Sequence, residues 1–214
     1  MTLWLPLAGA ALLAIVYGFT LSRSPPSPAK LLLKISGMVI LTGVAAWAGA
    51  PLLLVAGLAA CTLGDAFLAG RPERWLIPGM AAFFVGHVFY VALFWATGQV
   101  SGDLLNTLGR AVLVFAGAGY IFWLSPSLGP MRLPVLAYGA VILVMGAAAI
   151  ALPPGYGLVL IGALMFIASD AILANELFRR PPGEAPRWIP SVSLWNLYFF
   201  GQMLICLGMI GTSV

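Results

Sequence analysis

Long apolar segments alternate along this chain with short polar breaks that are rich in proline and glycine. The segments are apolar on every face, whereas a surface helix of a soluble protein keeps a polar face. They repeatedly reach the ~20 residues that a helix needs to cross ~30 Å of hydrocarbon. The pattern predicts an all-α bundle of eight transmembrane helices in a single domain over residues 1–214. The expected spans are about 2–21, 31–48, 52–69, 76–97, 104–124, 133–152, 157–178 and 190–212.

The composition agrees with a membrane protein. Of the 214 residues, 62% are hydrophobic and 7% are charged, against roughly 25% charged residues in a soluble domain. The breaks at 22–28 and 179–184 each contain several prolines, which cannot continue a helix because proline lacks an amide donor. No break is long enough to hold a separate soluble domain.

The basic residues are distributed unevenly between alternate breaks. Only Arg110 lies near an even break, and the odd breaks carry Arg23, Lys30, Lys34, Arg71, Arg74, Arg132, Arg179, Arg180 and Arg187. Because cytoplasmic loops carry the excess of Lys and Arg, this distribution predicts cytoplasmic odd loops and both termini on the outer side. The charges of the first span follow it, so we expect a retained helix and not a cleaved signal peptide. Absent eukaryotic targeting signals, the bacterial inner membrane is the expected location.

Several classes of function are disfavoured. The net charge of +4 is spread over short loops, which does not suit nucleic-acid binding, and nothing predicts an obligatory protein partner. Cys61 and Cys206 fall within spans, where a buried cysteine behaves as a small hydrophobe. With one histidine and no Cys-x-x-Cys, a zinc site is not expected, and we predict no metal and no cofactor. Glycine-rich phosphate loops and Gly-x-Ser-x-Gly elbows are also missing from the sequence.

Two matching fragments place a carboxylate inside an apolar span. Residues 64–69 read Gly-Asp-Ala-Phe-Leu-Ala, and residues 169–174 read Ser-Asp-Ala-Ile-Leu-Ala. One span later the sequence continues with Phe-Phe-Val-Gly-His at 83–87 and Tyr-Phe-Phe-Gly-Gln at 198–202. A carboxylate inside a bilayer costs several kcal/mol, so Asp65 and Asp170 mark a functional site. The repetition predicts two parallel four-helix halves that face one shared site.

Further polar residues lie in the middle or cytoplasmic half of the spans: Lys34, His87, Tyr90, Asn196 and Gln202. Each has a structural alternative to a role in the site. Lys34 either contacts a substrate, snorkels to the interface or pairs with Asp65. His87 and Tyr90 either take part in the chemistry or form hydrogen bonds between helices. Asn196 and Gln202 either bind a substrate or form polar contacts between helices. The two Asp residues are either catalytic or a polar lock between the halves.

The order of these motifs resembles the YhhN family of membrane proteins, which includes the lysoplasmalogenases. The resemblance rests on Lys34, Gly-Asp at 64–65, Phe-Phe-x-Gly-His-x-x-Tyr at 83–90, Ser-Asp at 169–170 and Tyr-Phe-x-Gly-Gln at 198–202. It covers nearly the whole chain and implies hydrolysis of the vinyl ether of a lysoplasmalogen, a lysophospholipid. The products would be a fatty aldehyde and glycerophosphoethanolamine or glycerophosphocholine. Some bacterial relatives have His at the position of Gln202, so a proton-transfer role is not assigned to it.

This chemistry suits the residues. Protonation of a vinyl ether leaves an oxocarbenium ion, and a carboxylic acid with a carboxylate handles such a species, as in glycoside hydrolysis. In an apolar cavity two nearby carboxyl groups resist double ionisation, so one stays protonated. We expect Asp170 to be the acid and Asp65 the carboxylate, with catalytic help from His87 and Tyr90. The expected substrate-binding residues are Lys34, Ser169, Asn196, Tyr198 and Gln202.

Two other classes of function fit the same inventory. A secondary transporter uses intramembrane carboxylates such as Asp65 and Asp170 to bind a coupling ion. In a non-catalytic lipid-binding protein there is no turnover, and the two carboxylates would affect stability only. A hydrolase differs from both because it makes aldehyde in detergent without any gradient.

Overall fold

The computed structural model describes residues 3–100, 103–181 and 183–211, and within them the secondary structure is entirely helical. The helices are α1 (Trp4–Thr20), α2 (Pro28–Trp47), α3 (Leu52–Leu68), α4 (Pro72–Thr97), α5 (Leu104–Leu124), α6 (Arg132–Ile150), α7 (Gly157–Phe178) and α8 (Trp188–Gly211). Two 3₁₀ turns, η1 (Ser125–Ser127) and η2 (Gly129–Met131), join α5 to α6. Residues 2 and 212, at the ends of the predicted spans, lie outside the described residues.

Within the described residues, six helical segments are long and apolar enough to cross a membrane: Pro28–Trp47, Arg74–Thr97, Leu104–Ser127, Gly129–Ile150, Gly157–Phe178 and Trp188–Gly211. The helices α1 and α3 are also apolar but have 17 residues each, at the lower limit for a span. The protein is thus an integral membrane protein with an all-α fold. The prediction of eight full membrane spans and the prediction of a repeat of two four-helix halves both stay predictions.

Two helices begin three or four residues earlier than the predicted spans. α2 starts at Pro28 instead of residue 31, and α4 starts at Pro72 instead of residue 76. The Ser27 hydroxyl accepts a hydrogen bond from the Lys30 amide and caps α2. Proline is tolerated in a first turn because its missing N–H would have no partner there. The prolines of these breaks therefore start helices as well as interrupting them.

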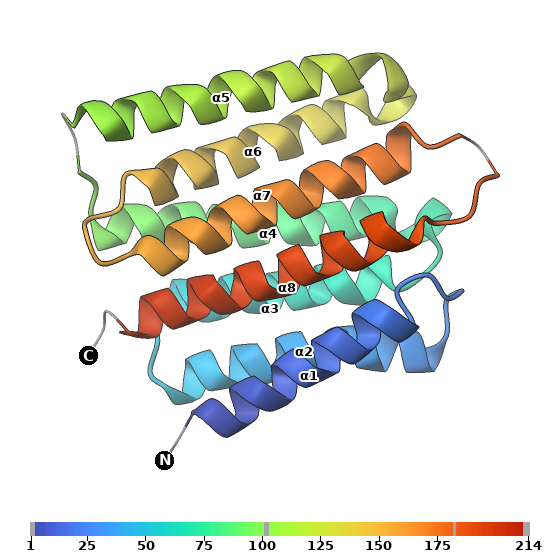
Figure 1. Cartoon of the computed structure of the whole chain (residues 1–214), viewed down its shortest axis with the longest axis horizontal. Coiled ribbons are helices and arrows are strands. Elements are labelled where there is room, and N and C mark those ends of the chain that lie inside the picture. Colours follow the sequence, from blue (N-terminus) through green and yellow to red (C-terminus); the bar gives the residue numbers. More distant parts are fainter. Residues whose placement is uncertain (1–2, 101–102, 182, 212–214) are drawn as a thin grey trace.

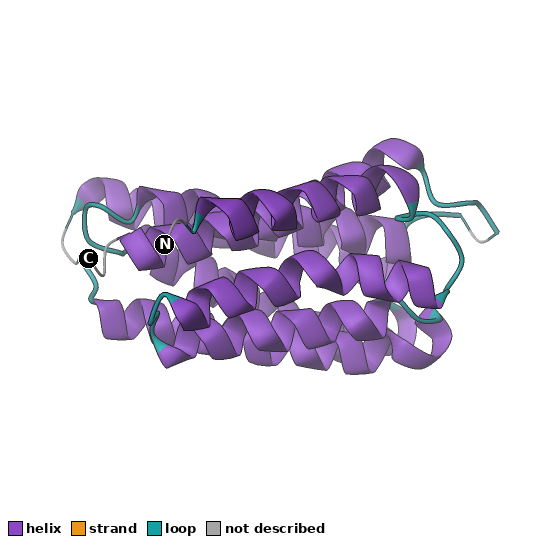
Figure 2. Ribbon diagram, turned by 90° about the horizontal axis from the view of Figure 1, so that it is seen from below, coloured by secondary structure: helices purple, strands orange, loops and turns teal. Residues whose placement is uncertain are grey.

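The helices run along the long axis of the molecule, with connections at its two ends (Figures 1 and 2). In Figure 1, α7, α8 and α1 lie in front of α4, α3 and α2, and α6 and α5 form one edge. The connections after α1, α3, α5 and α7 share one end, opposite the starts of α1 and α5 (Figure 1). That end carries the odd breaks and hence most of the basic residues, and is called the basic end below.

The pairs α3/α4 and α7/α8 pack most extensively, and glycines allow their close approach. A Cβ on Gly162 would lie 2.5 Å from the Gly201 carbonyl oxygen and 2.9 Å from the Ile205 amide nitrogen. In the other pair, a Cβ on Gly86 would lie 2.7 Å from Cys61 Sγ and 3.2 Å from the Gly57 carbonyl oxygen. These close approaches hold α3, which carries Asp65, against α4, and hold α7, which carries Asp170, against α8.

Gly162→Ala is therefore expected to destabilise the protein by about 2 kcal/mol, because the added methyl group meets backbone atoms that cannot move aside. Gly119→Ala is the matched control, since a Cβ on Gly119 meets nothing within 4 Å. Unfolding of the purified protein in detergent measures both variants. Equal stability of the two would show that α7 and α8 do not pack through Gly162.

Candidate active site

A polar cavity of about 180 Å³ lies between α1, α2, α3, α4, α7 and α8, toward the basic end. It brings together five of the residues predicted for the site, and these are Lys34, Asp65, Ser169, Asp170 and Tyr198. Its other polar and aromatic lining residues are Tyr17, Ser22, Lys30, Phe83, Ser191 and Trp195. Residues from both halves of the sequence therefore meet at one cavity.

Asp65 is held by two partners on different helices. It is 2% exposed, and its Oδ2 accepts a hydrogen bond of 2.6 Å from the Tyr198 hydroxyl on α8. Lys34 Nζ on α2 lies 3.4 Å from Asp65 Oδ1 and 5.8 Å from the centroid of the Trp195 ring. A buried carboxylate needs this compensation, because unpaired burial of a charge is very costly. Lys34 is thus an ion-pair partner of Asp65 as well as a cation at the cavity wall.

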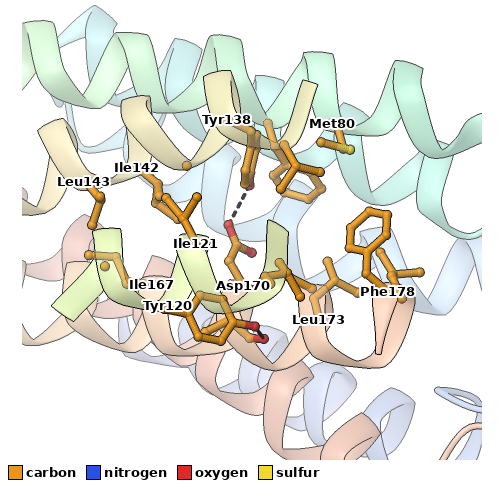
Figure 3. A pocket seen from close by; sticks show the side chains of 18 of the residues that line it. Met80, Tyr120, Ile121, Tyr138, Ile142, Leu143, Ile167, Asp170, Leu173 and Phe178 are labelled. Carbon is orange, nitrogen blue, oxygen red and sulfur yellow. Dashed lines mark hydrogen bonds between the residues drawn. The ribbon is translucent and has the colours of Figure 1, made fainter. Parts of the chain in front are cut away.

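Asp170 has a different environment. Its Oδ2 accepts a hydrogen bond of 2.6 Å from the Tyr138 hydroxyl on α6 (Figure 3). Among the described residues, no Lys or Arg lies within ion-pair distance of Asp170. Asp65 therefore has a cationic partner and Asp170 has a neutral one. This contrast separates the two carboxyl groups chemically.

Tyr138 was not identified from the sequence, although a comparison of the two halves contains a signal for it. Lys34 lies six residues after the first residue of α2, and Tyr138 lies six residues after the first residue of α6. Each of them contacts the Asp of its own half. The residue type differs, so inspection of charged residues alone misses Tyr138.

Asp170 also lines a second, apolar cavity of about 110 Å³ between α3, α4, α5, α6 and α7 (Figure 3). The two cavities share six lining residues, namely Leu68, Leu76, Phe83, Asp170, Leu173 and Leu177. Asp170 is the one residue with a charged or polar side chain in that shared wall. Its carboxyl group thus stands where a polar space adjoins an apolar one.

His87, Tyr90 and Gln202 are fully buried, and none of them is among the residues that line either cavity. The His87 Nδ1–H donates to the Phe83 carbonyl oxygen at 2.6 Å. The Tyr90 hydroxyl donates to Gln202 Oε1 at 2.5 Å. His87 packs its ring edge-to-face against Tyr138, with centroids 5.4 Å apart. His87 therefore supports the partner of Asp170, and a direct catalytic role for His87 or Tyr90 stays a prediction.

Asn196 lies outside the polar cavity too. Its Nδ2 donates to the Val192 carbonyl oxygen of its own helix at 2.8 Å, and it is not among the lining residues. Ser169 does line the cavity, but its hydroxyl donates to the Leu194 carbonyl oxygen of α8 at 2.8 Å. Of the residues predicted to bind substrate, Lys34, Ser169 and Tyr198 reach the cavity and Asn196 and Gln202 do not.

Lys30 is a cavity residue for which the sequence suggested only a topological role. It lies four residues before Lys34, which places both on one helix face. Its Nζ donates to the carbonyl oxygens of Ser24 at 2.6 Å and Ser22 at 3.4 Å. Two lysines therefore line the cavity near the basic end. In the part of the chain that the structure describes, no three His, Cys, Asp or Glu side chains come together as a metal site.

Residues 29–209 match the YhhN family. The chain belongs to the YhhN family. Its relatives include lysoplasmalogenase TMEM86B of Homo sapiens, 31% identical over 76% of this chain and 65% of the relative. Lysoplasmalogenase TMEM86A of Bos taurus is 30% identical over 72% of this chain and 63% of the relative. Lysoplasmalogenase TMEM86B of Mus musculus is 35% identical over 72% and 65%.

These alignments span just under two thirds of the length of each relative. No solved structure matches the chain. The matched region includes α2 to α8 nearly complete, and therefore Lys34, both Asp residues and their two tyrosine partners.

Proposed function

We propose that this protein is a membrane hydrolase of the lysoplasmalogenase type. It would cleave the vinyl ether of a lysoplasmalogen and release a fatty aldehyde and a glycerophosphodiester. The names of the relatives support this substrate class. The observation that carries the proposal is the pair Asp65 and Asp170 on one cavity, with one carboxyl group paired to a cation and the other hydrogen-bonded to a neutral tyrosine.

The first step of the proposed reaction is transfer of a proton from Asp170 to C2′ of the alkene, which leaves an oxocarbenium ion at C1′. Asp65 then takes a proton from water as the water oxygen bonds to C1′. In the resulting hemiacetal, Asp170 removes the hydroxyl proton while Asp65 protonates the departing glycerol oxygen. The C1′–O bond breaks, aldehyde forms, and both carboxyl groups regain their starting states. This division of labour parallels the two carboxyl groups of glycosidases.

The surroundings of each carboxyl group support these roles. Lys34 favours the charged form of Asp65, which suits a base. Asp170 has no such cation among the described residues and adjoins an apolar cavity, an environment that suits an acid. The headgroup phosphate would face Lys30 and Lys34 at the mouth of the cavity, since lysine is a common phosphate ligand.

The proposed topology has the basic end of the bundle in the cytoplasm. The excess of Lys and Arg at the odd breaks supports this orientation, and we infer the inner membrane of a bacterium as the location. Substrate would then enter from the cytoplasmic leaflet, with its headgroup at the basic end. Both termini would face the outer side.

The proposal is tested by incubating the detergent-purified protein with a defined 1-alkenyl lysophosphoethanolamine and measuring aldehyde. We expect one aldehyde and one glycerophosphoethanolamine per substrate consumed, without a gradient and equally in the presence of a chelator. A transporter would leave the lipid unaltered. Intact substrate after incubation with folded protein, with ethanolamine and choline headgroups alike, would rule out the hydrolase.

A further inference from the structure

The apolar cavity beside Asp170 has almost no free polar surface. Its only side chains with oxygen or nitrogen are those of Asp170, Tyr120 and Tyr138. The Tyr138 hydroxyl donates to Asp170, and the Tyr120 hydroxyl donates to the Ala171 carbonyl oxygen at 2.6 Å. A cavity of this kind does not hold water well, because water needs two to four polar partners. Its natural occupant is a hydrocarbon group.

The cavity has a polar side and a deep apolar end. Asp170 opens into both cavities, and Tyr138 faces it across the space (Figure 3). Ile167 precedes Asp170 by three residues on α7, and Leu143 follows Tyr138 by five residues on α6. Because α7 ends and α6 begins at the basic end (Figure 1), Ile167 and Leu143 lie farther from that end than the two polar groups.

Glycines on the facing helices let the side chains that line this space pack closely against the backbone. Gly117 of α5 and Gly139 of α6 both line it. A Cβ on Gly139 would lie 2.7 Å from Ile121 Cδ1, and a Cβ on Gly117 would contact Leu143. Larger residues at either position would therefore displace Ile121 or Leu143, both of which line the cavity.

We propose that this apolar cavity is the binding subsite for the single hydrocarbon chain of an ether lysolipid, with the chain running from Asp170 toward Ile167 and Leu143. The occupant follows from the continuity of the two cavities: a molecule with a polar head at Lys30 and Lys34 and one apolar tail fits both at once. The identity of the polar headgroup rests on the proposed function. The hydrocarbon character of the chain rests on the lining of the cavity alone. It assigns Ile167 and Leu143 to chain recognition and not to catalysis.

Photolabelling tests this subsite with a 1-O-alkyl lysophosphocholine that carries a diazirine at mid-chain and has no vinyl ether. We expect residue-level mass spectrometry to find the label on Ile167, Leu143 and their neighbours in the cavity. Ile167→Phe should lower that labelling about tenfold, because the larger ring fills the space. Ile161→Phe is the matched control on the same helix, where residue 161 is 51% exposed on the outer surface, and Ile167→Val should retain the labelling.

Label confined to exposed residues such as Ile161, or equal labelling of wild type and Ile167→Phe, would overturn the subsite. The position of the label in wild type decides the question even if Ile167→Phe does not fold. The probe cannot be hydrolysed as a vinyl ether, so its result does not depend on turnover. Cavity labelling without aldehyde release would retain the subsite and reject the hydrolase, whereas aldehyde release with surface labelling alone would do the reverse.

Discussion

Asp170→Asn is expected to lower aldehyde release by about 10³-fold, within the range for loss of a general acid. Asparagine keeps the shape of the side chain and can still accept the hydrogen bond from Tyr138, but it has no acidic proton to give to the alkene. The wall shared by the two cavities would keep its form. Initial rates of aldehyde formation at saturating lysoplasmalogen measure the change in kcat.

The matched control for this substitution is Asp103→Asn. The Asp103 carboxylate accepts hydrogen bonds from the amides of Leu105 and Asn106 at the start of α5, and asparagine caps a helix equally well. Asp103→Asn should therefore keep full activity. An Asp170→Asn variant that elutes like wild type and retains more than about a tenth of its kcat would contradict an acid role, since general acids contribute at least ~10²-fold.

Asp65→Asn is expected to have two separable effects. It removes the proposed base, and it leaves the buried Lys34 ammonium without its carboxylate partner. Removal of one member of a buried ion pair costs about 3–5 kcal/mol. We therefore expect a lower unfolding temperature in detergent together with the loss of aldehyde release.

The double variant Lys34→Met/Asp65→Asn separates these effects. With both charges gone, the stability should return close to that of wild type, because replacement of a buried ion pair by apolar groups is often neutral. Aldehyde release should stay at the level of Asp65→Asn. Recovery of activity along with stability would show that Asp65 acts only as a structural lock between helices, which is the alternative that the sequence left open.

The membrane class and the helical elements follow from local features of the chain. Hydrocarbon offers no hydrogen-bond partners, so an apolar segment of sufficient length has to form a helix. Hydrocarbon also makes a carboxylate costly to bury, and this cost identified Asp65 and Asp170 from the sequence. The first residues of α2 and α4 were harder to predict from the sequence, because proline can end a preceding segment and can also begin a following helix.

The membership of the site depends on which helix faces pack together, and no local pattern contains that information. His87 and Lys34 were equally conspicuous as polar residues in apolar spans, yet Lys34 reaches the polar cavity and His87 packs behind Tyr138. Tyr138 looked like any interfacial tyrosine until the packing of α6 against α7 placed its hydroxyl on Asp170. The apolar cavity is likewise a product of glycines and side chains from five helices. Periodicity and burial cost act within one segment, whereas a cavity forms from surfaces that meet only after the helices assemble.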